Sequence, residues 1–166
     1  KIFYITFFGF IFLIMSACGA YSFTGATTNA DTLQVNFFRN QASLVEPTLS
    51  QRFTPELQDL FLRQTNLTLV NNPNADLRLE GEITGYRINP MSATAQQTAA
   101  QNRLTVAVNV RFYNNLDEKK DFEKSFSFYS DFSANEQLVG GVLESALEEI
   151  LERILQDIFN AALGDW

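Results

Sequence analysis

The chain has 166 residues, with 12 basic and 19 acidic side chains and a formal net charge of −7 at pH 7. It contains one cysteine and no histidine, which excludes intrachain disulfides, zinc sites built from cysteine and histidine, Ser-His-Asp triads and Cys-His dyads. An acidic chain is poorly suited to nucleic acid, because that binding depends on neutralising phosphates. The sequence also has no glycine-rich phosphate loop, paired-carboxylate signature or metal-ligand spacing, so we expect no enzyme activity and no cofactor.

The first segment of the chain has the pattern of a secretory signal. Lys1 precedes the apolar run 2–15, and Ser16 and Ala17 precede the single cysteine, Cys18. A charged start, an apolar stretch and small residues before a cleavage site are typical of a signal peptide. The apolar stretch of about 16 residues is shorter than the roughly 20 that a membrane-spanning helix needs.

The cysteine makes this signal more specific. Met15-Ser16-Ala17-Cys18 is similar to a bacterial lipobox, in which the cysteine thiol is acylated and becomes the new N-terminus. We therefore predict a lipoprotein signal peptide over residues 1–17 and a single lipid-anchored domain over residues 18–166. An ordinary buried thiol is the alternative interpretation of Cys18.

The rest of the chain alternates strand-like and helix-like periodicities. Gly81 and Gly85 interrupt an otherwise apolar strand face, which indicates a bulge or a close backbone approach. In chain order the patterns predict a strand over 32–38, a helix over 47–64, strands over 67–70 and 77–88, a polar loop over 89–101, a strand over 103–113, a charged turn over 114–121, a strand over 122–132 and a helix over 138–163.

The last predicted helix has apolar pairs every four residues, from 138/139 to 162/163. Each step of four residues advances about 40° around a straight helix, so one flat sheet face cannot cover the whole stripe. One interpretation is a broad stripe on a curved helix. The other is that the later turns face a partner, with these candidate contact residues: Ile154, Ile158, Phe159, Leu163 and Trp166.

This order of elements predicts an α+β fold. We expect a two-layer α/β sandwich, with a mixed sheet of about four to five strands covered on one face by two helices. Arg78, Arg103 and Arg111 then fall on the exposed face. They either pair across strands with Glu80 and Glu82 or recognise phosphate or carboxylate groups.

Several stretches resemble one family. They are the opening Cys18-Gly19-Ala20-Tyr21-Ser22-Phe23-Thr24-Gly25, Pro47-Thr48-Leu49-Ser50, Asn102-Arg103-Leu104-Thr105-Val106 and Gln156-Asp157-Ile158-Phe159-Asn160. Together they are similar to the LptE lipoproteins of Bacteroidota-type bacteria, over essentially the whole mature chain. The most specific of them is the Cys-Gly-x-Tyr-Ser-Phe opening.

The resemblance implies an LptE-like fold and a non-enzymatic role at the outer membrane. LptE proteins partner the β-barrel LptD, plug it, help it assemble, and so support lipopolysaccharide transport and insertion. Lipopolysaccharide and the outer membrane are then further partners, with the lipid on Cys18 as the only attached group. Basic residues contact lipopolysaccharide in relatives, and the candidates here are Arg87, Arg103 and Arg111.

The resemblance also bears on location. Gly19 follows the cysteine, as in outer-membrane lipoproteins, and the next acidic residue is Asp31. This favours anchoring on the periplasmic side.

Two other functions stay open at this point. One is a periplasmic amphiphile-binding lipoprotein not tied to a barrel, which needs an apolar cavity between helices and sheet. The other is a hydrolase that works through carboxylates.

Overall fold

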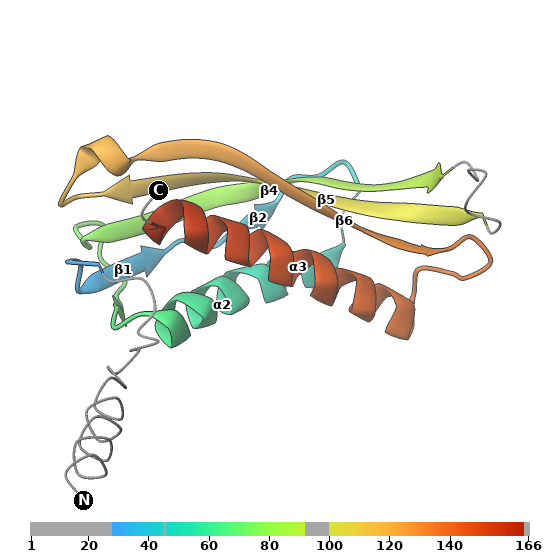
Figure 1. The fold of residues 1–166 in the computed structure, drawn as a ribbon, viewed down its shortest axis with the longest axis horizontal. Helices are drawn as coiled ribbons and strands as arrows, with labels where there is room; N and C mark the ends of the chain where they lie inside the picture. The colour runs from blue at the N-terminus through green and yellow to red at the C-terminus, as the bar shows by residue number, and fades with distance from the viewer. Residues whose placement is uncertain (1–27, 45, 92–99, 165–166) are drawn as a thin grey trace, which may run out of the picture.

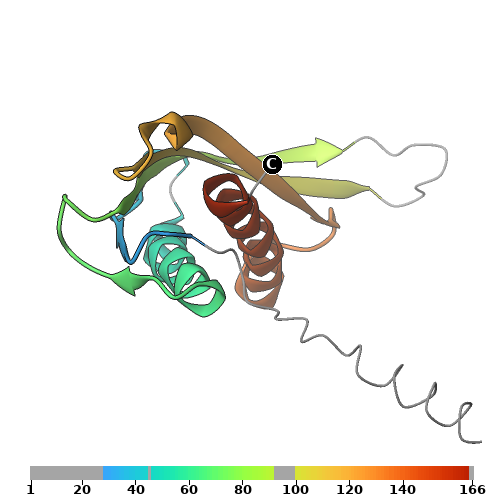
Figure 2. The same cartoon turned by 60° about the vertical axis from the view of Figure 1, so that its left-hand side comes forward.

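The computed structural model describes residues 28–44, 46–91 and 100–164. They form two layers, with a twisted mixed sheet on one side and two helices on the other (Figures 1 and 2), which confirms the predicted α+β sandwich. The elements are β1 (Thr32–Val35), β2 (Arg39–Asn40), α2 (Pro47–Gln64), β3 (Thr68–Leu69), β4 (Leu77–Met91), β5 (Gln101–Asn114), the 3-10 turn η2 (Glu118–Lys120), β6 (Phe122–Ser133) and α3 (Gly140–Leu163).

The sheet has six strands. Five of them follow the order β3-β1-β4-β5-β6, and the sixth, the two-residue β2, pairs with β4 further along the edge that β1 occupies. β1 runs parallel to β3 and β4, whereas β4, β5 and β6 are antiparallel. Neighbouring parallel strands need a long crossover, and here α2 supplies it between β1 and β3. None of the helices described is long and apolar enough to cross a membrane.

Helix α2 covers the range that the sequence predicts, 47–64. The Glu46 side chain accepts a hydrogen bond from the Thr48 backbone N–H at 3.2 Å and caps the first turn. Four large residues at intervals of four are completely buried against the sheet, namely Leu49, Phe53, Leu57 and Phe61. This spacing is the apolar face that the periodicity predicted.

The carboxylate of Asp76 holds the start of β1 against the start of β4. It accepts hydrogen bonds from the backbone N–H groups of Asp31 and Thr32 and from the Thr32 hydroxyl, each at 2.9 Å. The Thr32 oxygen accepts the Asp76 backbone N–H in return. These donors lower the pKa of Asp76, because they stabilise its ionised form.

The β4–β5 hairpin is longer than predicted. Residues 89–101 were expected to form a loop, but Asn89, Pro90 and Met91 pair with β5 residues, and Gln101 is already in β5. Small polar residues continue the ladder because hydrogen bonding between neighbouring strands does not require apolar side chains. The remaining part of that expected loop, 92–99, lies outside the described residues.

Strand β4 contains the bulge that its glycines indicated. The β4–β5 register shifts between Ile83 and Gly85, so Thr84 is an extra residue in the ladder. Side chains alternate between faces along a strand, so one extra residue moves all later side chains to the opposite face. Before the bulge, odd-numbered residues such as Ile83 face the helices. After the bulge, odd-numbered residues such as Arg87 lie on the opposite face.

Gly81 is a site of close approach. A Cβ atom there would lie 2.1 Å from the Asn109 carbonyl oxygen and 2.6 Å from Cε1 of Phe38. Phe38 in turn packs on Phe53, with 4.9 Å between ring centroids, and its backbone N–H donates to the buried Thr54 hydroxyl at 3.0 Å. The missing side chain at Gly81 therefore lets the β1–β2 bend lie against α2.

Gly81→Ala is expected to destabilise the protein by about 1–3 kcal/mol, because the new methyl group forces the β5 backbone and Phe38 to move. The measurement is urea unfolding of the full chain in non-ionic detergent, followed by circular dichroism. Gly141→Ala is the matched control, since no atom lies within 4 Å of a Cβ there. It should change stability by under about 1 kcal/mol, in favour of folding. Equal effects of the two variants would contradict the close-approach explanation.

Candidate functional site on the uncovered face of the sheet

The helices leave one face of the sheet open (Figures 1 and 2). This outer face is polar. Its side chains come from alternate positions of β1, β4, β5 and β6. In β5 the inward residues Leu104, Val106, Val108, Val110 and Phe112 are completely buried. The residues between them face outward, and they carry the charged and amide groups considered below.

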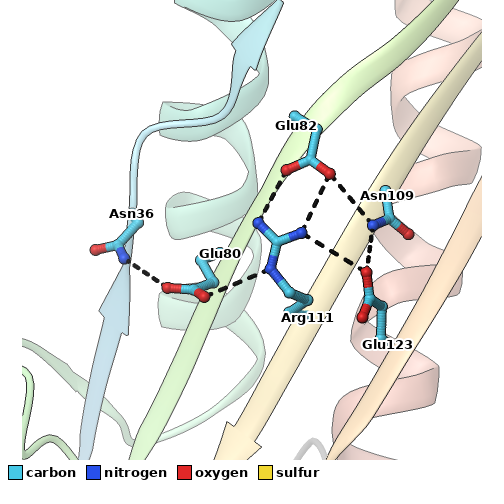
Figure 3. A network of polar contacts seen from close by, with 6 residues as sticks. All are labelled: Asn36, Glu80, Glu82, Asn109, Arg111 and Glu123. Atoms are coloured by element: carbon cyan, nitrogen blue, oxygen red, sulfur yellow. Dashed lines mark hydrogen bonds and ion pairs between the residues drawn. The ribbon is translucent and has the colours of Figure 1, made fainter. Parts of the chain in front are cut away.

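Arg111 lies at the centre of this face. Its Nη1 and Nη2 atoms donate to the two carboxylate oxygens of Glu82 at 3.1 and 2.9 Å, and Nε donates to Glu80 at 3.5 Å. A third carboxylate, that of Glu123, lies 3.8 Å from Nη1. One guanidinium therefore joins carboxylates from β4 and β6 (Figure 3).

Two amides extend this network across four strands (Figure 3). Asn36 of β1's C-terminal flank donates to Glu80 at 3.2 Å. Asn109 of β5 donates to Glu82 at 3.2 Å and to Glu123 at 2.8 Å. The network has three carboxylates for one guanidinium. Asn36 donates to the Glu80 oxygen that Arg111 does not contact, whereas Asn109 shares its Glu82 and Glu123 oxygens with Arg111.

These contacts change the ionisation of the network. Hydrogen bonds from Arg111 lower the pKa of Glu82, against the opposing effect of desolvation, and Asn109 adds to the lowering. The same hydrogen bonds raise the pKa of Arg111. Both groups are therefore charged throughout the neutral range and hold each other in place.

A second cluster lies nearer the long hairpin. Arg103 of β5 forms a bidentate pair with Asp131 of β6, with distances of 2.7 and 2.8 Å. The guanidinium also lies over the Tyr129 ring, 3.5 Å from its centroid. The hydrogen bonds from Arg103 lower the pKa of Asp131.

Arg87 differs from these two arginines. The bulge places it on the outer face, where it lies opposite Thr105 and diagonal to Arg103. It is exposed, and it forms no ion pair with any residue of the described ranges. Among the three lipopolysaccharide-contact candidates, Arg87 is thus the one whose guanidinium is available within the described part of the chain.

The cross-strand alternative therefore accounts for Arg111, which pairs with Glu80 and Glu82 as the sequence suggested. It does not describe the other two. Arg103 pairs with Asp131, and Arg78 lies over the Tyr113 ring at 4.4 Å from its centroid. Neither pairing was predictable, because the sequence does not give the register between strands.

The late turns of α3 are not a free apolar surface. Ile154, Ile158 and Phe159 are 1, 0 and 4% exposed, so the expectation that they face a partner is wrong for them. Leu163 is half-buried and packs against the same core, and Trp166 lies outside the described residues. The reason is that α3 packs on the sheet along one side and on α2 along the other, as the 5.0 Å contact between the Phe61 and Phe159 rings shows.

Cys18 also lies outside the described residues, together with the whole predicted signal peptide. The described chain begins ten residues later, at Thr28. Lipid attachment at Cys18 therefore stays a prediction.

The surface has clefts, and their linings are mixed. One of about 680 Å³ lies between the end of α3 and the β5–β6 turn, and another of about 550 Å³ lies along the outside of the α2–α3 contact. Between helices and sheet, large side chains of both layers meet with no exposure. The amphiphile-binding alternative needs an apolar cavity between helices and sheet, and neither the mixed surface clefts nor this packed interior supports it.

Comparison with known proteins identifies the family. The model of the LptE family, described as lipopolysaccharide-assembly, matches residues 30–162. The chain belongs to the LptE family. Membership implies a role in lipopolysaccharide assembly within a family of non-enzymatic, envelope-associated lipoproteins. A comparison with curated sequences gives no match.

Solved structures support the LptE-like fold. A hypothetical protein from Chlamydia trachomatis has a TM-score of 0.56 at 12% identity, covering 81% of this chain and 96% of that chain. A minor lipoprotein from Acinetobacter baumannii has a TM-score of 0.48 at 13% identity, covering 78% of this chain and 89% of that chain. At such identities the likeness concerns the fold alone. The Chlamydia trachomatis structure, with the TM-score of 0.56, is the one that supports the fold.

Sequence reasoning missed four members of the outer-face clusters: Asn36, Asn109, Glu123 and Asp131. The available signal was the alternation in β5 and β6, which puts polar residues at every second position. That pattern identifies the face of each residue. It does not identify the cross-strand partner.

Arg111→Met is expected to destabilise this LptE-family protein at pH 7 by roughly 1–2 kcal/mol, because charge-assisted hydrogen bonds to two carboxylates are lost. The folded pKa of Glu82 lies below its unfolded value of about 4.3. The ionised Glu82 carboxylate therefore contributes its full stabilisation above the unfolded pKa. This stabilisation is lost as the pH falls through the folded pKa. The difference between native and variant proteins should thus shrink in acid, measured by urea unfolding at several pH values.

The matched control is Arg63→Met. Arg63 makes one exposed ion pair with Asp59 on the same helix, so its removal should change stability little at any pH. A loss in Arg111→Met that does not depend on pH would show that its alkyl packing matters rather than its charge.

Proposed function

We propose that this LptE-family protein is an outer-membrane lipoprotein, anchored through Cys18 on the periplasmic side, that plugs an LptD-type β-barrel and assists its assembly. In this way it would support lipopolysaccharide transport and insertion. The single observation that carries the proposal is the family match over residues 30–162.

The outer face supports a protein partner. Besides Arg39 of β2, which lies opposite Glu82, it carries four arginines on β4 and β5 and no described lysine, whereas Lys119 and Lys120 lie in η2 and Lys124 lies on the inward side of β6. Arginine and tyrosine are enriched in protein interfaces, and lysine is depleted. The four arginines are Arg78, Arg87, Arg103 and Arg111.

The charges of this face also suit a polar surrounding. This face has five arginines, counting Arg39, against four carboxylates, although the whole chain has a net charge of −7. The carboxylates are Glu80, Glu82, Glu123 and Asp131. The interiors of membrane β-barrels are polar. The paired side chains of Arg103 and Arg111 can lie against such a wall without burying an uncompensated charge.

The short distance between the anchor and the domain is the second support. If Cys18 is acylated, ten residues separate the lipid from Thr28, and an extended chain of that length spans at most about 36 Å. The domain would then stay close to the membrane surface.

The intact lipidated chain should co-purify with an LptD-type barrel after detergent extraction, identified by mass spectrometry. Cys18→Ser should remove the protein from the outer-membrane fraction and lower the amount of assembled barrel. Cys18 is the only cysteine, and Ser22→Ala is a control in the same segment that leaves the lipobox unchanged. Recovery of the native protein only as a free monomer would contradict the partner, and normal localisation of Cys18→Ser would contradict the anchor.

We also propose that Arg87, next to Arg103, contacts lipopolysaccharide phosphate. A complex that contains Arg87→Gln should bind purified lipopolysaccharide about tenfold more weakly than the complex with the native protein. This factor corresponds to one charge-assisted contact of about 1.4 kcal/mol. Arg39→Gln removes another exposed arginine, on β2, and should leave capture unchanged. Equal capture by native protein and Arg87→Gln would exclude this role. Arg111 is the weakest of the three candidates, because carboxylates already surround it.

A further inference from the structure

The two edges of the sheet are unlike each other. One ends at β3, which has two residues, and the other ends at β6, which has twelve. A free edge strand presents unpaired backbone N–H and C=O groups to any other extended chain, and proteins commonly protect such edges by keeping them short. β3 has this protection. No strand within the described ranges pairs with the outer side of β6.

The backbone groups that face this free edge belong to the odd-numbered residues of β6. The Ala134 N–H donates to the Ala100 carbonyl at 3.0 Å, which makes these two residues a hydrogen-bonded pair with β5. Such pairs alternate along an antiparallel ladder, and the β5–β6 register continues from there without a shift. The even-numbered residues therefore bond to β5, and the N–H and C=O groups of Ser125, Ser127 and Tyr129 point away from it.

The middle of this edge has none of the usual barriers to pairing. The segment 125–130, Ser-Phe-Ser-Phe-Tyr-Ser, contains no charge and no proline, and its ladder has no bulge. Ser125, Ser127 and Tyr129 are exposed. Charges occur only beside the segment, at Glu123 and Lys124 on one side and Asp131 on the other. A strand of this kind is open to strand addition in its centre.

Most carboxylates beside the edge are paired with arginines, and Glu149 is the exception within the described ranges. Ser130 Oγ donates to Glu149 of α3 at 2.5 Å, and Arg153 lies 5.8 Å from the Phe128 ring and 3.4 Å from Asp157. Asp157, Asp131 and Glu123 thus lie beside Arg153, Arg103 and Arg111, whereas Glu149 has no ion pair within the described ranges. A second copy would bring two chains of net charge −7 together, each with Glu149, which no described ion pair neutralises, beside the edge, and like charges oppose that pairing.

We propose that the β6 edge accepts an extended segment of the barrel partner as an additional strand of the sheet. The fitting segment has an uncharged centre opposite 125–130 and a lysine or arginine where it passes Glu149, beside Ser130. The identity of the partner rests on the proposed function, whereas the pairing rests on the edge itself. Main-chain hydrogen bonds supply the affinity in this mode of recognition.

The deciding experiment compares Ser127→Pro with Ser127→Thr in the full lipidated chain, co-expressed with its barrel. Proline removes the N–H of residue 127, which faces the free edge, and leaves the bonds to β5 in place, which edge strands tolerate. Threonine keeps that N–H and favours strands. Ser127→Pro should lower the recovered barrel by at least about tenfold, and Ser127→Thr should recover native amounts.

A second measurement does not depend on the folding of the proline variant. Photoreactive benzoylphenylalanine is introduced at the position of Ser125 or of Tyr129, and the adducts are mapped by mass spectrometry. Both positions should link to one partner segment, at sites about four residues apart, because strands pair residue by residue.

The outcomes separate this inference from the proposed function. If native protein recovers the barrel but Ser127→Pro recovers it equally well, or if the two adducts map to separate segments, the β6 pairing is wrong and the barrel partnership stands. If the adducts have twice the mass of this chain, the occupant is a second copy and the inference is overturned. If even native protein recovers no barrel, the proposed function and this inference both fail.

Discussion

The structure depends on a single geometric constraint in β4, the strand that pairs with β1, β2 and β5. Its side chains must alternate between a face covered by helices and a face open to solvent, and the bulge at Thr84 reverses that alternation once. Before the bulge the strand supplies Glu80 and Glu82 to the outer face, and after it the strand supplies Arg87. Gly81 adds the space for Phe38, through which the β1–β2 bend reaches α2. Core and outer face are therefore set by the same short segment.

Two of the charged side chains on the outer face are held in place by their neighbours. Arg111 and Arg103 are held by carboxylates, and Arg103 also by an aromatic ring, so the side chains lose little further freedom when a partner covers them. The chain's excess negative charge lies elsewhere, largely on α3 and the turns. This distribution agrees with an LptE-family protein that meets a polar protein surface on its sheet side.

The sequence predicted much of the secondary structure, because the periodicities are local properties. The apolar spacing in α2 gave its bounds of 47–64, and the alternation in β5 identified Leu104 to Phe112 as core. The errors came from tertiary contacts. The strands of the β4–β5 hairpin extend through polar residues because neighbouring backbones supply the hydrogen bonds. The late turns of α3 are buried because the helix has two neighbours instead of one, and no pattern within α3 states how many layers will cover it.

The amino-acid sequence by itself determined the α+β class, the exclusion of histidine and disulfide chemistry, the two helices and the strand faces, since each follows from composition or from spacing within one element. It also carried the family resemblance. The tertiary structure alone decided which carboxylate meets which arginine. It also decided that, among the described residues, Arg87 has no ion pair and β6 ends the sheet with one edge of its backbone unpaired. These features depend on register and strand order, which arise when distant segments meet, and they are not encoded in the periodicity of any single segment.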